Sequence, residues 1–160
     1  HVAAPIIFFR CQTIDGKFIG KQFDSGKFLD LRSYVTHTSF GEGFTMVNKR
    51  MVQGNPYPEE LRGYEGLGCS RIIAKYGPAY LSDLVIRVYD KRGGERLSGF
   101  FSRSFWKRLP LLARGHLTML SEFWPSISWI RKLKLTVLSC VYKFLGLSYK
   151  RLFEEKRRTE

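Results

Sequence analysis

The side chains in this chain that most often carry out catalysis are those of His37, Cys69 and His116. His37 lies in the segment YVTHTSF, where an imidazole could act as a general base. Cys69 lies in GLGCSR, where the start of a helix would lower the pKa of a thiol. None of the three has a partner nearby in the sequence that would orient it. We therefore expect packed or surface side chains at these positions and no catalysis; an enzyme would need one of them to meet a carboxylate across the fold.

Motifs for metals and nucleotides are also missing from the sequence. The three Cys and three His are too far apart along the chain to form the paired spacings of metal sites. The segment GYEGLG does not have the order of glycines that binds dinucleotides, and GKF lacks the hydroxyl residue of a phosphate-binding loop. The carboxylate pairs in PEEL and FEEK are typical of helix surfaces. We expect no metal and no cofactor, although phospholipid such as cardiolipin could bind.

The charge of the chain points to a polyanionic partner. The sequence contains 27 Lys and Arg against 14 Asp and Glu, which gives a formal net charge of +13 and a pI of about 9.9. Residues 1 to 90 mix both signs, whereas most of the excess lies in later segments such as DKRGGERLSGFFSRSFWKR and WIRKLK. RNA, anionic lipid and acidic proteins would all be attracted to this half of the chain.

The size and composition indicate one ordinary folded domain with an appended arm. The chain has 160 residues, of which 44% are hydrophobic and 15% aromatic, and this excludes a disordered chain. Its three cysteines are isolated and odd in number, so a reducing compartment is expected rather than a disulfide framework. The sequence starts at His1 and not at Met, which predicts a fragment or a processed mature protein, and removal of a mitochondrial import presequence is one such processing step.

The first part of the chain, residues 1–101, reads as a mostly β domain. The pair Asp15-Gly16 between apolar residues predicts a hairpin turn, and KFLDLRSYVTHTSF and FTMVNKRMVQG continue the extended pattern. A loop or short-helix insertion is predicted near residues 55–77. The segment SDLVIRVYDKRGGERLSGFF predicts a second hairpin that turns at Gly93-Gly94.

The second part, residues 102–158, has helical periodicity. Pro110 and Gly115 should kink or split its first helix, and a serine after Trp124-Pro125 could cap a long amphipathic helix over residues 126–157. The predicted fold class is therefore α+β, with a small antiparallel N-terminal sheet of hairpins followed by a basic, aromatic-rich helical C-terminal half.

The long helix carries a narrow polar stripe. At 100 degrees per residue the stripe contains Lys132, Thr136, Ser139, Lys143, Gly146 and Lys150. Apolar residues occupy well over half of the remaining circumference, which is more than a surface helix normally buries. We therefore expect this helix to have an apolar host on most sides and water or an anion along one line.

Four surroundings could satisfy that helix: a membrane interior, a membrane surface, other subunits or an ordinary core. Leu133 to Tyr149 is shorter than the roughly 20 residues of a membrane span. Lys143 near its centre would cost about 2.5 to 3.5 kcal/mol to insert. A helix at the headgroup boundary or between subunits is favoured. The residues expected to bind anionic lipid or partners are Arg131, Lys132, Lys134, Lys143, Lys150 and Arg151, and the expected interfacial aromatics are Trp106, Trp124 and Trp129.

Together these features predict a non-catalytic accessory subunit of a large mitochondrial inner-membrane energy-converting complex, such as ATP synthase or a respiratory complex. The protein would lie at or partly within the membrane and pack on other subunits and on anionic lipid. The alternative is an organellar ribosomal protein that binds rRNA, since Arg and Lys lie beside aromatic and Gly residues in YDKRGGER and SRSFWKRL.

Overall fold

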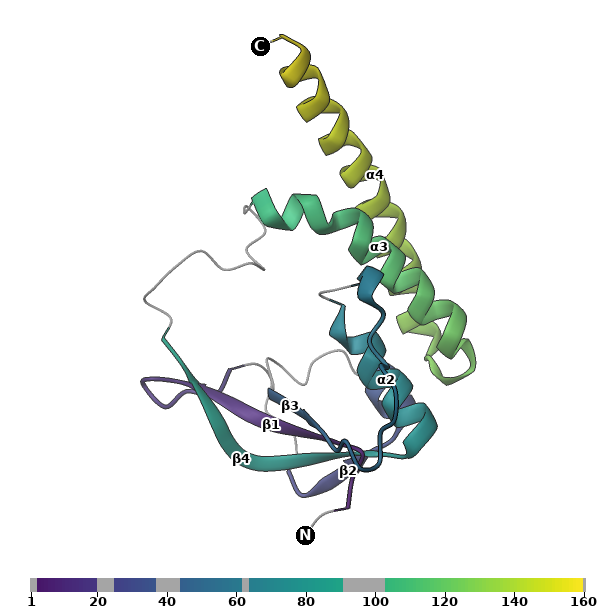
Figure 1. Cartoon of the computed structure of the whole chain (residues 1–160). Helices are drawn as coiled ribbons and strands as arrows, with labels where there is room; N and C mark the ends of the chain where they lie inside the picture. The colour runs from purple at the N-terminus through teal and green to yellow at the C-terminus, as the bar shows by residue number, and fades with distance from the viewer. Residues whose placement is uncertain (1–2, 20–24, 37–43, 62–63, 91–102, 160) are drawn as a thin grey trace. The chain divides into compact units, whose positions relative to one another are not determined.

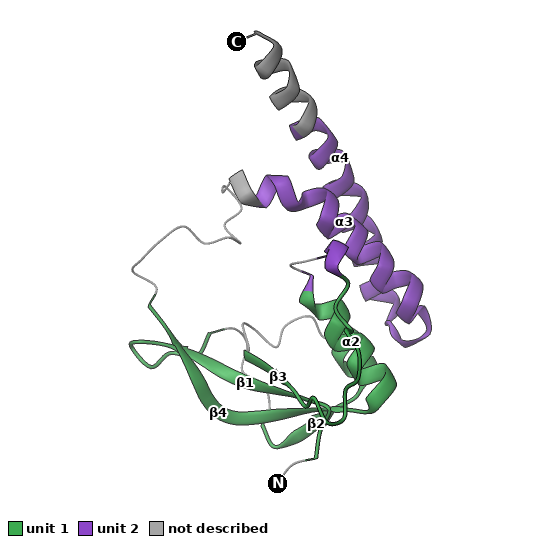
Figure 2. Ribbon diagram, in the orientation of Figure 1, with its two compact units in different colours: residues 1–58, 65–93 green, residues 59–64, 94–160 purple. Residues whose placement is uncertain are grey.

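The computed structural model describes residues 3–19, 25–36, 44–61, 64–90 and 103–159, with the side chains of the C-terminal helices described from 105 to 149. The chain divides into two compact units, one of residues 1–58 and 65–93 and the other of residues 59–64 and 94–160 (Figure 2). Strands belong to the first unit and long helices to the second. The predicted α+β class is thereby confirmed.

The first unit is built on a four-stranded mixed sheet (Figure 1). Its strands are β1 (Ile6–Thr13), β2 (Lys27–Leu29), β3 (Phe44–Val47) and β4 (Ala79–Tyr89), and they lie in the order β2-β4-β1-β3. The outer pairs β2/β4 and β1/β3 are antiparallel, as predicted, but the central pair β1/β4 is parallel. The predicted antiparallel sheet is therefore correct at its edges and mixed at its centre.

The turn predicted at Asp15-Gly16 is confirmed. Gly16 has a φ of 78°, and the Thr13 amide donates a hydrogen bond of 2.8 Å to the Lys17 carbonyl. Within the part of the returning chain that the structure describes, up to residue 19, one isolated antiparallel bridge joins Gln12 and Phe18, and the long partner of β1 is β4. The second predicted turn, at Gly93-Gly94, and His37 lie outside the described residues.

One helix occupies a segment where a strand was predicted, and a second lies in the segment predicted as a loop or short helix. Helix α1 (Leu31–Thr36) replaces part of the expected extended run, because the Asp30 carboxylate accepts a 2.7 Å hydrogen bond from the Ser33 amide and starts a helix there. This bond keeps the pKa of Asp30 below its usual value. Helix α2 (Glu65–Tyr76) lies within the insertion predicted near 55–77 and has twelve residues.

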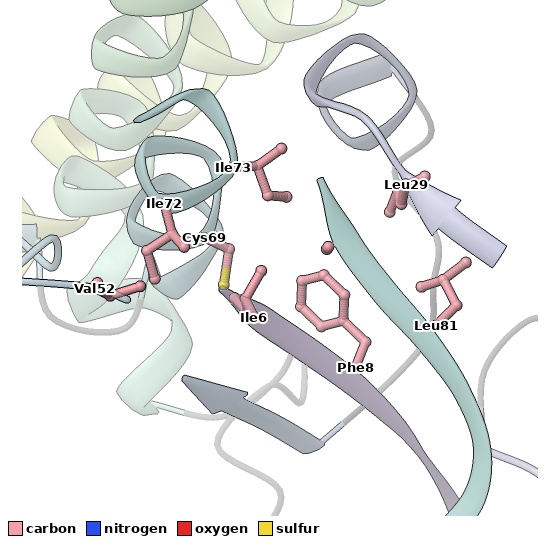
Figure 3. Close-up of a cluster of buried hydrophobic side chains, with 9 residues drawn as sticks. Ile6, Phe8, Leu29, Val52, Cys69, Ile72, Ile73 and Leu81 are labelled. Atoms are coloured by element: carbon pink, nitrogen blue, oxygen red, sulfur yellow. The ribbon is translucent and has the colours of Figure 1, made fainter. Parts of the chain in front are cut away.

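One face of the sheet packs against α2 and forms the core of this unit. Ile6 and Phe8 from β1 and Leu81 from β4 meet Cys69, Ile72 and Ile73 from the helix (Figure 3). Phe8 also stacks on Tyr34 of α1, with ring centroids 5.5 Å apart. The core therefore uses alternate residues of β1, which leaves the intervening residues on the other face.

The second unit is a helical hairpin. It contains the short helix η1 (Glu59–Leu61), the long helix α3 (Arg103–Phe123), the turn η2 (Trp124–Ser126) and the long helix α4 (Trp129–Thr159). Pro110 does not split α3, which is one continuous helix that bends in its first half (Figure 1). Helix α4 starts three residues later than predicted, because Ile127 is extended at φ −88° and ψ 132° and separates it from η2.

Two glycines allow close packing within this hairpin. A Cβ atom on Gly146 of α4 would lie 2.9 Å from Cγ of Pro110 in α3, and a Cβ atom on Gly115 would lie 2.6 Å from the ring of Tyr64. Both neighbours are rigid rings joined closely to the backbone. The two glycines therefore set how near α4 and the Tyr64 segment lie to α3.

We expect Gly146→Ala to destabilise the hairpin. Alanine gains up to about 1 kcal/mol of helix propensity, but the added methyl group must push the Pro110 ring and its backbone away, at about 1 to 3 kcal/mol. The net effect should be a lower free energy of unfolding in denaturant titrations followed by circular dichroism. Thr136→Ala, at an exposed position of the same helix, is the control and should change stability little. A Gly146→Ala protein as stable as the control would contradict the close contact.

Candidate interaction surfaces

Helix α4 packs on α3 through a face that mixes apolar and polar residues. Leu135, Ser139 and Gly146 are buried, and Arg131 and Tyr142 are partly buried along the same side. The Ser139 hydroxyl donates a 2.7 Å hydrogen bond to the Leu135 carbonyl, which satisfies it within the helix. Two members of the predicted polar stripe, Ser139 and Gly146, therefore face α3, whereas Thr136 and Lys143 are exposed.

The opposite side of α4 exposes a row of large apolar side chains, here called the outer stripe. It consists of Trp129, Ile130, Leu133, Val137, Val141, Phe144 and Leu147. Trp129, Ile130 and Phe144 are 73%, 81% and 70% exposed. These positions recur at helical spacing, so they lie on one side of the helix, away from α3. Helix α4 is thus apolar on two sides, and only one of them is covered by this unit.

Cations border the outer stripe on both edges. Lys143 lies along one edge and Lys134 along the other, and both are exposed. Lys132 lies on the Lys143 side, and its ammonium group is 4.4 Å from the centre of the Trp124 ring. This arrangement of an apolar band with flanking ammonium groups is typical of helices that lie in the headgroup region of an anionic membrane.

The remaining predicted site residues have different surroundings. Arg131 is half-buried on the α3 side of α4 and lies near Tyr64 and His116; burial lowers the pKa of its guanidinium group. Trp106 stacks on Tyr149 within the hairpin, with centroids 6.0 Å apart. Trp124 and Trp129 are exposed. The side chains of Lys150 and Arg151 are outside the described residues.

A line of aromatic rings runs through the hairpin and includes His116. The ring of Tyr64 lies 5.5 Å from His116, which lies 5.6 Å from Tyr142, and Phe105 continues the line at 6.4 Å. Sequence reasoning did not find this cluster, because Tyr64 comes from a segment almost forty residues before α3. The one local signal is Gly115, whose missing side chain makes room for the Tyr64 ring.

The three catalytic candidates are not assembled into a described site. Burial raises the pKa of the Cys69 thiol, which disfavours a reactive thiolate, and its Sγ lies 3.9 Å from the Tyr57 hydroxyl. Cys69 belongs to the first unit and His116 to the second. Among the described residues, no group of three or more His, Cys, Asp or Glu converges to hold a metal ion.

A second apolar surface lies on the sheet, on the side turned away from α2, and is here called the open sheet face. Residues paired across neighbouring strands point to the same face, and the pairs Phe28 with Tyr80, Tyr80 with Ile7, and Ile7 with Met46 form a row across all four strands. Phe9 and Phe44 form a second pair beside it. Sequence reasoning missed this surface. The signal was the run IIFF in β1. Its odd-numbered and even-numbered residues are both apolar, which predicts an apolar side chain on each face of the strand.

No known protein family, curated protein or solved structure matches the chain. Within the described residues, no helix has both the length and the apolar character needed to cross a membrane. Functional inference therefore rests on the surfaces described above.

His116 should make the stability of the hairpin sensitive to acid. It is 9% exposed, and burial together with the nearby Arg131 guanidinium lowers its pKa from 6.5 to about 4. The unfolded chain therefore binds a proton at a higher pH than the folded chain does. The unfolding free energy should decrease as pH falls from about 6.5 to about 4, by about 2 to 3 kcal/mol.

Two measurements check this expectation. In an NMR titration, the imidazole signals of His116 should stay those of a neutral ring at pH 5.5. His116→Phe keeps a ring in the cluster but cannot bind a proton. The loss of unfolding free energy that His116 causes between about pH 6.5 and pH 4 should therefore disappear in this variant, while the loss caused by carboxylates remains. A His116 that titrates near pH 6.5 in the folded protein would disprove its burial in the hairpin.

Proposed function

We propose that this protein is a non-catalytic accessory subunit of a large mitochondrial inner-membrane energy-converting complex, such as ATP synthase or a respiratory complex. It would attach to anionic lipid through α4 and pack on neighbouring subunits. The observation that carries the proposal is the outer stripe of α4, a band of exposed apolar side chains bordered by lysines. Free in water, this band would be an uncovered apolar patch.

The energetics favour a helix that lies in the plane of the membrane surface. Full burial of a large apolar side chain contributes roughly 1.5 to 3 kcal/mol, so partial burial of seven such residues contributes several kcal/mol. Each Lys or Arg near an anionic surface adds about 1 kcal/mol. Ammonium groups at the edges of the stripe can remain at the level of the phosphates while the stripe enters the acyl region. No span is required for this attachment.

The mitochondrial setting is supported by two general features of the chain, its free cysteines and its high pI. The described cysteines Cys11, Cys69 and Cys140 are all free, which suits a reducing compartment. The pI of about 9.9 suits the anionic surface of an inner membrane rich in acidic phospholipid. The C-terminal half carries this charge, since residues 91–160 contain 16 Lys and Arg against 5 Asp and Glu, a net charge of +11.

Vesicle sedimentation of the full-length chain tests lipid attachment. The protein should pellet with vesicles that contain cardiolipin or another anionic lipid, and less with neutral phosphatidylcholine vesicles. The fluorescence of exposed Trp129 should shift to shorter wavelength on binding, because the indole leaves water. Absence of both effects would rule out attachment through α4.

A matched pair of variants locates the binding surface. Phe144→Glu places a charge in the outer stripe, and Ser121→Glu makes the same change in net charge at an exposed position of α3. We expect at least a tenfold lower vesicle partition coefficient for Phe144→Glu and little change for Ser121→Glu. Equal losses would mean that net charge alone, and not the stripe, governs binding.

Native co-fractionation tests membership of a complex. The protein should migrate with subunits of a membrane complex after mild detergent extraction, and nuclease treatment should not change its migration. Co-sedimentation with ribosomal particles that nuclease abolishes would instead support the alternative, an organellar ribosomal protein that binds rRNA.

A further inference from the structure

The exposed side of α4 contains a heptad repeat. Its residues follow one another at alternating spacings of three and four, as the a and d positions of a coiled coil do. The six positions, a and d in turn, are Ile130, Leu133, Val137, Cys140, Phe144 and Leu147. These residues are here called the heptad seam. All six are exposed, and five of them belong to the outer stripe.

The period and the residue types of the heptad seam favour one α-helix as the partner. A seven-residue repeat keeps the seam turned toward a neighbouring helix along its whole length, because the two helices wind around each other. A lipid surface imposes no such repeat. Two of the three a positions are the β-branched Ile130 and Val137, and two of the three d positions are leucines. In parallel coiled coils, this combination favours two helices over larger bundles.

The heptad seam lies on the side of α4 that is opposite to α3. At 100 degrees per residue, its centre is about 180 degrees from the residues that pack on α3, which include Leu135, Ser139 and Gly146. A partner helix can therefore lie along α4 without displacing α3.

The outer stripe has the area that a stable complex needs. Its seven residues are between 42% and 81% exposed. With aromatic side chains of about 150 to 250 Å² and somewhat smaller aliphatic ones, the exposed area is on the order of 800 Å². A stable complex buries about 800 Å² on each partner. A single helix packed along the stripe therefore finds enough apolar surface there.

Lysines at the edges of the heptad seam select an acidic partner. The e and g positions flank the a and d positions, and ion pairs made there set the choice of partner. Lys134 occupies an e position and Lys143 a g position, and both are exposed. None of the e and g positions between residues 129 and 148 is acidic. A second copy of the chain offers these lysines no opposite charge there, and it would bring two C-terminal halves of net charge +11 together.

We propose that the heptad seam docks one α-helix of another protein, with apolar residues at its own a and d positions and Glu or Asp at its e and g positions. This partner is additional to the anionic lipid of the proposed function. Lipid and helix exclude each other, because they cover the same side chains of α4. The partner helix therefore releases the protein from a membrane surface when it binds.

Fluorescence anisotropy with a synthetic peptide tests the docking. The probe is a labelled peptide of four heptads with Ile at a, Leu at d and Glu at e and g, and the control peptide has Lys in place of each Glu. Like charges at e and g keep either peptide from pairing with itself. With the full-length chain and no lipid, we expect a dissociation constant in the micromolar range for the Glu peptide. The Lys peptide should bind at least tenfold more weakly.

Two sets of variants locate the interface. Leu133→Glu places a charge at a d position and should weaken binding of the Glu peptide at least tenfold, whereas Ser121→Glu, at an exposed position of α3, makes the same change in net charge and should have little effect. The double variant Lys134→Glu/Lys143→Glu leaves the heptad seam intact and should reverse the preference, so that the Lys peptide binds more tightly than the Glu peptide. Retained circular dichroism in each variant shows that loss of binding is not loss of folding.

Vesicle sedimentation separates the partner helix from lipid. Added Glu peptide should release the full-length chain from anionic vesicles. A chain that pellets with vesicles and binds neither peptide overturns the helix proposal and leaves lipid attachment intact, whereas a chain that binds the Glu peptide and no vesicles supports the helix and rejects lipid attachment. Equal binding of the two peptides also overturns the proposal. Self-association of the chain alone that Leu133→Glu abolishes, measured by sedimentation velocity, would overturn it too, because the occupant would then be a second copy.

Discussion

The close approach of α3 and α4 at Gly146 decides which side of α4 is left for partners. Gly146 lies against the Pro110 ring, and Gly115 makes room for Tyr64. With the Gly146 contact made, the side of α4 that contains Leu135, Ser139 and Tyr142 faces α3. The helix cannot then rotate to hide Ile130 or Phe144 within the hairpin. Packing inside the unit thus leaves an apolar surface on its outside. The buried, neutral His116 and the partly buried Arg131 lie in the same packed region between the helices.

The two units present surfaces of different chemistry. The sheet unit is nearly neutral and offers an uncharged aromatic face, whereas the helical unit is strongly basic and offers an apolar stripe with ammonium groups at its edges. A polyanionic surface discriminates between them by charge, and an apolar protein surface discriminates by shape.

Local patterns in the sequence predicted the class of the fold, the turn at Asp15-Gly16 and a long basic helix near the C-terminus. Three features were not predicted. The parallel pairing of β1 and β4 needs α2 as a crossover, and the six-residue helix α1 depends on a single cap at Asp30. The residues of the polar stripe lie along one line of α4, but the stripe was expected to face water or an anion, and Ser139 and Gly146 face α3 instead. The Ser139 hydroxyl donates its hydrogen bond to a carbonyl of its own helix, so this side chain can face a neighbouring helix. A polar residue in the sequence therefore did not indicate a solvent-exposed side of the helix.

The parallel pairing of β1 with β4 also has a consequence for how the chain folds. Ile7 pairs with Tyr80, so the centre of the sheet cannot form until the chain between them has been arranged, whereas α3 and α4 are joined by a few residues and meet locally. The helical hairpin should therefore form early and the sheet late. During that interval β1 is a strand of mostly apolar residues with neither face covered, the kind of segment that adds to other strands by mistake.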